Sequence, residues 1–150
     1  MNQNDPQPPP ASIAASSSSS SSTKPSSPHR PAHKLRYIQY DSSKENEYVP
    51  VMRQLISRDL SEPYSIYVYR YFLYHWGDLC FLAMDDRQSE DEQLVGVIVS
   101  KLEPHRDGPL RGYIAMLAVK EEYRGSGIAT RLVGMAIDAM KERDAAEVGH

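Results

Sequence analysis

From Lys34 onward, the hydrophobic positions of the chain change between a helical period and the pattern of strands. Apolar residues at three- and four-residue spacing predict helices over 46–60, 65–75 and 127–143. Runs rich in β-branched, aromatic and aliphatic residues predict strands over 35–40, 79–84, 94–102 and 112–119. The order β-α-α-β-β-β-α indicates an α/β (α+β) domain in which helices flank a sheet.

Four segments between and after these elements carry their own signals. Ser61-Glu62-Pro63 interrupts the first helical pattern, because proline disfavours helical geometry in the residue before it. Turn residues over 105–109 predict an antiparallel hairpin of the two flanking strands. Segment 85–93 has five acidic residues and one arginine, which predicts a solvated loop or turn. Segment 145–150 resembles the first half of a further strand.

The first 33 residues differ in composition from the rest. They contain 7 of the 11 prolines and 10 serines, and only Met1 and Ile13 are aliphatic residues larger than alanine. Such a segment buries too little apolar surface to offset an ordering entropy of about 1–2 kcal/mol per residue. We therefore predict a disordered leader over 1–33 and one domain over 34–150.

Charge and cysteine content exclude several classes of function. A net charge of −3 argues against a nucleic-acid binder built on a basic face. The single cysteine, Cys80, excludes an internal disulfide framework and a cysteine metal cluster, and its apolar neighbours predict a core position. No apolar run is long enough for a membrane span. We expect an intracellular protein without a metal, a membrane or a nucleic-acid partner.

One segment, from Val119 to Thr130, carries candidate chemistry. It joins a predicted strand to a predicted helix, and Gly125 and Gly127 let a ligand approach the backbone closely. Unpaired N–H groups of the helix's first turn, together with the helix dipole, favour an anion, and Arg124 adds a cation. This predicts a cradle for a phosphate or diphosphate.

Other glycine-rich segments explain the cradle less well. A P-loop requires Lys and then Ser or Thr after its last glycine, but Ile128 and Ala129 follow Gly127. A dinucleotide fingerprint requires Gly or Ala where Thr130 stands. A plain turn that only connects a strand to a helix remains the alternative.

The full pattern Arg-x-x-Gly-x-Ala, in Arg124-Gly125-Ser126-Gly127-Ile128-Ala129, resembles the coenzyme A diphosphate motif of the GNAT acetyltransferases. Segments 59–72 and 111–119 are similar to the catalytic subunits of NatC-type N-terminal acetyltransferases, and the resemblance extends over about 35–148. It implies the GNAT fold, with a mixed sheet flanked by helices, and acetyl-CoA as cosubstrate. The residues implied in holding the coenzyme are Leu117, Ala118, Val119, Arg124, Gly125, Ser126, Gly127, Ile128, Ala129 and Thr130.

The resemblance also implies an acceptor and partners. The acceptor is the α-amine of nascent protein N-termini that begin with Met and a bulky apolar residue. The residues implied in binding this acceptor are Leu60, Glu62, Tyr64 and Tyr113. For Ser61 and Glu62, a helix cap is the alternative. Auxiliary NatC-type subunits, and through them the ribosome, are the implied partners in the cytoplasm, with 46–76 as the docking face.

Tyr67, Tyr71 and Tyr74 recur at helical spacing, which predicts that they pack in the core.

The chain departs from the family pattern at its C-terminal end. The family's next strand carries a glutamate base and the following helix a tyrosine acid, and residue 150 precedes both. We therefore expect a domain that is incomplete at its C-terminus, with its catalytic residues unassigned. We expect weak binding of acetyl-CoA and slow or no turnover. The alternative is an interaction module without catalytic activity.

Overall fold

A computed structural model describes residues 34–61, 63–106 and 108–148, so the predicted leader over 1–33 lies outside the described residues. The sheet order is β1-β2-β3-β4, and every neighbouring pair of strands is antiparallel. The strands are β1 Arg36–Gln39, β2 Phe81–Met84, β3 Leu94–His105 and β4 Gly108–Val119. The helices are α2 Glu45–Leu60, α3 Ile66–Trp76 and α4 Ile128–Val148. The mixed sheet that the resemblance implies is antiparallel throughout its described part.

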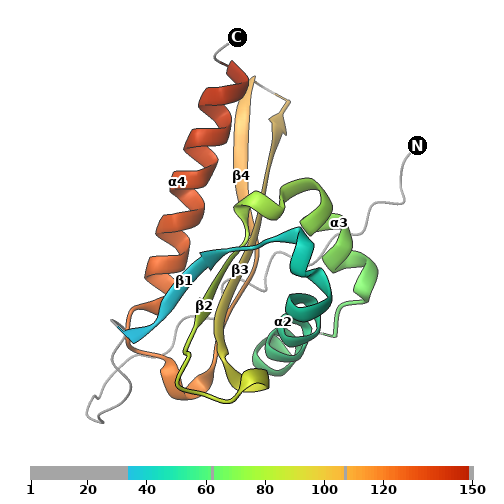
Figure 1. Ribbon diagram of the computed structural model, residues 1–150. Coiled ribbons are helices and arrows are strands. Elements are labelled where there is room, and N and C mark those ends of the chain that lie inside the picture. The colour runs from blue at the N-terminus through green and yellow to red at the C-terminus, as the bar shows by residue number, and fades with distance from the viewer. Residues whose placement is uncertain (1–33, 62, 107, 149–150) are drawn as a thin grey trace.

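Helices cover both faces of the sheet: α2 and α3 lie on one side and α4 lies on the other (Figure 1). The strands separate the two cores by alternation, so that in β2 Leu82 faces α2 and α3 while Ala83 faces α4. Cys80 is fully buried in the core beneath α2 and α3, which confirms its predicted core position.

The hairpin of β3 and β4 extends beyond the other two strands. β2 pairs with β3 only as far as Ile98. Beyond Ile98, β3 pairs with β4 alone among the described strands. The register shifts once in the middle of the hairpin, because Val99 lies opposite Met116 and Ser100 lies opposite Ile114. The extra residue is therefore Ala115, and β4, which is the edge strand of the described sheet, has a bulge there.

The predicted element types are confirmed for all three helices and all four strands, but two boundaries are corrected. The turn predicted over 105–109 is shorter, because β3 continues to His105 and β4 begins at Gly108. Pro104 does not end β3, since beyond Ile98 one side of that strand has no ladder partner among the described residues. The strand predicted over 145–150 is wrong as far as Val148, because the alanines there continue α4; residues 149–150 lie outside the description.

The prediction that three tyrosines pack in the core is wrong for two of them. Tyr67 is 70% exposed and Tyr74 is 84% exposed on α3, whereas Tyr71 is half-buried and contacts Phe72. The buried face of α3 is formed instead by Tyr69, Phe72, Leu73 and Trp76. Two sets of residues on α3 have the three- and four-residue spacing of a helix face. The set that includes Tyr69 faces the sheet, and the set that includes Tyr67 does not.

Two features are absent from the described residues. None of their helices combines the length and hydropathy that a bilayer crossing requires. Within the same residues, no three His, Cys, Asp or Glu side chains are grouped so that they could hold a metal ion.

Candidate functional site

The predicted cradle is an open run of backbone between the end of β4 and the start of α4. A short 3-10 turn over Glu121–Tyr123 follows β4, and Gly125 and Gly127 then adopt φ values of +83° and +87°. A Cβ atom built on either glycine would meet no atom within 4 Å, so the concave side is open. The left-handed backbone there requires glycine or imposes strain on any other residue. This backbone therefore leaves open space beside Gly125 and Gly127.

The cradle is held from behind by a buried carboxylate. Tyr123 is only 4% exposed, and its hydroxyl donates to Asp85 Oδ2 over 2.5 Å, while Ser126 Oγ donates to the Tyr123 carbonyl over 2.6 Å. Asp85 also accepts from the Arg87 guanidinium over 2.8 and 3.0 Å. These bonds, of which those from Arg87 are the strongest, hold the pKa of Asp85 well below its usual range. The solvated loop predicted over 85–93 is therefore wrong at its first residue, which is fully buried.

The first turn of α4 is fixed by close approach to β3. A Cβ atom on Gly96 would lie 2.8 Å from Ile128 Cγ2 and 3.3 Å from Leu132 Cδ1. Gly96 therefore lets α4 begin directly against the sheet. Both contacting side chains are buried, so the helix N-terminus cannot shift without repacking this core.

Beside the cradle, the outer edge of β4 meets two charged side chains. The Val119 N–H donates to Asp59 Oδ2 over 3.3 Å, and Arg124 Nε donates to the Val119 carbonyl over 3.2 Å. Arg124 Nη2 also donates to Asp59 Oδ1, which closes a triangle of contacts. Asp59 is the penultimate residue of α2, so this triangle joins α2, β4 and the cradle.

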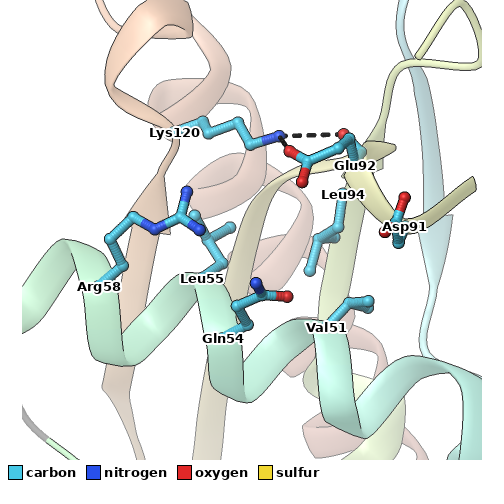
Figure 2. Close-up of a pocket in the computed structure, with 8 residues that line it drawn as sticks. All are labelled: Val51, Gln54, Leu55, Arg58, Asp91, Glu92, Leu94 and Lys120. Atoms are coloured by element: carbon cyan, nitrogen blue, oxygen red, sulfur yellow. Dashed lines mark hydrogen bonds and ion pairs between the residues drawn. The ribbon is translucent and has the colours of Figure 1, made fainter. Parts of the chain in front are cut away.

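A small pocket between α2 and the chain after β4 is shown in Figure 2. Its volume is about 10 Å³, and Lys120 Nζ lies over it, bonded to Glu92 Oε1 at 2.8 Å and to the Glu92 carbonyl at 3.0 Å. That volume is at the lower limit for one water molecule. The pocket is therefore too small for a ligand larger than a water molecule.

A larger groove of about 360 Å³ lies beside the α2–α3 turn. The residues that line it are Pro50, Arg53, Gln54, Ser57, Pro63, Tyr64 and Tyr69. Among the described residues, the buried hydroxyls of Tyr64 and Tyr69 have no hydrogen-bond partner, and burial raises the pKa of Tyr69. Ser61 ends α2 in a left-handed conformation with φ of 55° and does not cap α3.

The four predicted acceptor residues do not all lie together. Tyr64 lines the groove, and Leu60 packs, partly buried, against the neighbouring core. Tyr113 lies six residues before Val119 on β4, about 20 Å along the strand at 3.4 Å per residue. Its ring is 5.4 Å from Lys101 Nζ. Glu62 lies outside the described residues.

Two residues of this site were not predicted from the sequence. Asp59 lies in the last turn of α2, where the helix dipole disfavours a carboxylate, and that mismatch was a usable signal. Asp85 directly follows a buried strand, and the Arg87 two residues later was the signal for a local turn around its carboxylate.

Comparisons with known proteins agree on one family. The model of the acetyltransferase (GNAT) family matches residues 49–149. The chain is 54% identical over 114 residues to N-alpha-acetyltransferase 30 of Xenopus laevis, covering 76% of this chain and 39% of that protein. It is 47% identical over 112 residues to N-alpha-acetyltransferase 30 of Saccharomyces cerevisiae, covering 75% of this chain and 63% of that protein. The chain thus spans less than two thirds of the length of these relatives.

Solved structures are also similar. A crystal structure of the NatC complex bound to Gag peptide and CoA contains a chain with 47% identity and a TM-score of 0.68, covering 73% of this chain and 69% of that one. Arabidopsis thaliana Naa50 in complex with a bisubstrate analogue has 22% identity and a TM-score of 0.56, covering 73% of this chain and 66% of that one. The second similarity concerns the fold alone.

Proposed function

The chain belongs to the GNAT acetyltransferase family, and from that premise we propose that it binds acetyl-CoA and acetylates the N-terminal α-amine of proteins. The observation that carries this proposal is the open backbone with left-handed Gly125 and Gly127, which continues directly from the edge of β4 into α4. The open backbone beside the start of α4 and the guanidinium of Arg124 support the proposal of a diphosphate site. Support also comes from the relatives named N-alpha-acetyltransferase 30.

In this proposal the chain's own backbone holds the coenzyme. Amides between Gly125 and Thr130 bind the diphosphate, with the α4 dipole behind them and Arg124 at the rim. The outward backbone groups of Leu117 and Val119 pair with the pantetheine arm as an added strand does. When bound, acetyl-CoA supplies an activated thioester. An outward N–H of β4 near the Ala115 bulge stabilises the charge that develops on the thioester oxygen.

The acceptor we propose is a protein N-terminus that begins with Met and a bulky apolar residue. An α-amine with a pKa of about 7.7–8.0 must lose its proton before it attacks a thioester. Leu60 and Tyr64 at the α2–α3 turn contribute apolar surface near the end of α2 that contacts β4. The similar NatC complex carries a peptide, which supports a peptide acceptor.

The coenzyme site is tested by calorimetry with acetyl-CoA. Gly127→Asp places a carboxylate in the cradle, where it repels the diphosphate, and we expect at least tenfold weaker binding, equivalent to about 1.4 kcal/mol. Gly134→Asp is the matched control, because Gly134 is an exposed position of α4 where a Cβ would meet nothing within 4 Å. Circular dichroism checks that both variants fold. Equal affinity of the wild type and Gly127→Asp would remove the coenzyme assignment.

The acceptor is tested separately with two peptides. We expect the chain, alone or with its auxiliary subunits, to acetylate a peptide that begins Met-Leu faster than one that begins Ser-Glu. Mass spectrometry of the products locates the acetyl group on the α-amine. Equal rates for the two peptides would remove the acceptor assignment and leave the coenzyme site intact.

A second candidate function, an interaction module, is favoured by the exposed tyrosines of α3. Tyr67 and Tyr74 leave an aromatic surface open to solvent, and aromatic residues are enriched at interfaces between proteins. We propose that this surface contacts an auxiliary NatC-type subunit, which associates the chain with ribosomes in the cytoplasm. Co-purification with that subunit should weaken in Tyr67→Ser/Tyr74→Ser. Unchanged co-purification would place the interface elsewhere.

A further inference from the structure

The outward backbone groups of Val119 are both taken by side chains. Lys120 donates its N–H to the Val95 carbonyl over 2.8 Å, so the alternation of an antiparallel ladder directs the N–H and C=O of Val119 away from β3. Asp59 accepts that N–H and Arg124 donates to that carbonyl, and the two side chains are paired with each other. We call these three contacts the Asp59–Arg124 clasp.

The position of Asp59 is not explained by its helix. Residues at the C-terminal end of a helix favour cations, and a carboxylate there is repelled by the partial negative charge of the last carbonyls. The Asp59 side chain is nevertheless only 8% exposed, and both of its oxygens face groups of other elements. The contacts with Val119 and Arg124 therefore account for its orientation.

We propose that the Asp59–Arg124 clasp occupies the edge of β4 that the coenzyme's arm requires, so that Asp59 sets the affinity of the chain for acetyl-CoA. This inference rests on the proposed function, because it concerns the same coenzyme. An arm that pairs with β4 must take the Val119 N–H from Asp59 and the Val119 carbonyl from Arg124. Asp59 is a positioning residue here, since it holds Arg124 and Val119 and does not touch the thioester.

Opening the clasp has two physical costs. A hydrogen bond to a charged acceptor is stronger than one to a neutral acceptor, so Asp59 competes with the neutral amides and carbonyls of the pantetheine arm. The carboxylate also lies against Arg124 at the rim of the cradle, where it partly cancels the cation available to a diphosphate. Loss of this carboxylate should therefore tighten binding of acetyl-CoA.

The variant that tests the proposal is Asp59→Asn, which keeps the shape of the side chain and removes its charge. We expect acetyl-CoA to bind about tenfold more tightly in calorimetry. Adenosine 3′,5′-bisphosphate is the second probe, because it lacks the pantetheine arm and cannot compete for Val119. Its affinity should rise less than that of acetyl-CoA, because only the effect of Asp59 on the Arg124 cation reaches its phosphates. Glu122→Gln is the matched control, since it removes an equal charge from an exposed side chain beside the cradle.

The outcomes separate this inference from the proposed function. If Asp59→Asn increases the affinity for both ligands equally, or if Glu122→Gln increases it as much, general charge repulsion explains the effect and the inference fails. If the wild type binds acetyl-CoA and Asp59→Asn binds it equally or more weakly, the inference fails while the proposed function stands. If Gly127→Asp binds as the wild type does, the proposed function fails.

Amide hydrogen exchange tests the clasp without any ligand. The Val119 amide should be protected in the free wild-type chain and should exchange at least tenfold faster in Asp59→Ala, which leaves no side-chain acceptor. Circular dichroism shows whether the variant folds. Equal exchange of Val119 in two folded proteins would overturn the clasp.

Discussion

Asp85→Asn is the substitution that most directly tests how the cradle is supported. The Asp85 carboxylate is fully buried and accepts from the Tyr123 hydroxyl, the Arg87 side chain and the Arg87 N–H at 3.1 Å. An asparagine has one oxygen in place of two, and its NH₂ group faces donors. Hydrogen bonds to charged groups contribute about 1.5–3 kcal/mol each, and the Arg87 side chain, which is 42% exposed, can return to water. We therefore expect a loss of about 2–3 kcal/mol, or about 10 °C in Tm.

The pH dependence gives this prediction its sign. The pKa of Asp85 is depressed in the folded chain, so its stabilisation is complete above the unfolded pKa of about 3.9. That stabilisation is lost as the pH falls toward the folded value. Urea unfolding should therefore show a difference between wild type and Asp85→Asn that is constant from pH 7 to pH 5. At pH 3 the difference should be smaller by about 1 kcal/mol.

Tyr123→Phe is the companion variant, because it removes only one of the donors to Asp85. We expect it to be less destabilising than Asp85→Asn, and the double variant to be less destabilising than the sum of the two, since both remove the same contact. Acetyl-CoA binding should weaken in parallel, because the Tyr123 hydroxyl fixes the turn whose backbone carbonyl accepts from Ser126 Oγ. The reasoning is refuted if the stability difference between wild type and Asp85→Asn is the same at pH 3 and pH 7.

Three further predictions concern the packing of the domain. Gly96→Ala should lower the free energy of unfolding by about 1–3 kcal/mol, because the new methyl group collides with Ile128; urea unfolding measures this, and an unchanged midpoint would contradict it. Trp76→Phe should cost about 1–3 kcal/mol in the same assay, because it removes the indole N–H that donates to the buried Leu102 carbonyl over 2.9 Å; a neutral effect would show that water replaces it. Cys80 should react with a maleimide only on unfolding, because burial raises the pKa of its thiol, and rapid labelling of the folded chain would contradict this.

The sequence predicted the elements well because their signals are local. In α2 and α4 the spacing of apolar residues shows which helix face is buried, and in β3 a run of β-branched residues indicates a buried strand. Both signals can be read from neighbouring residues of the sequence. The predicted end of α4 was wrong, because Ala145 and Ala146 are compatible with a helix and with a strand. They are helical because they continue the helix that precedes them. The turn over 105–109 was too long, because proline is tolerated in a strand whose outer side has no partner.

In the candidate site, too, local features could be predicted from the sequence and contacts between distant residues could not. The open backbone at Gly125 and Gly127 could be predicted, because the glycines and Arg124 lie within one short segment. Asp59 and Asp85 could not, since their partners Arg124 and Tyr123 lie 65 and 38 residues away in sequence. The helix end at Asp59 and the nearby Arg87 mark the two carboxylates as unusual, but neither signal identifies the distant partner, and an acidic run such as 85–93 is solvated in most proteins. Contacts of this kind follow from topology and not from local pattern.

The long hairpin of β3 and β4 has a consequence for how the domain loosens. Near Val119 the hairpin is bonded to a third strand. Near Gly112 no third strand among the described residues pairs with the hairpin, and side chains such as Met140 of α4 lie against it. Hydrogen-bonded ladders open cooperatively, while side-chain contacts at a projecting end can open locally at a lower free energy. Fraying should therefore start at the hairpin tip and stop before it reaches Val119, so that partial unfolding spares the end of β4 where we propose that the coenzyme binds.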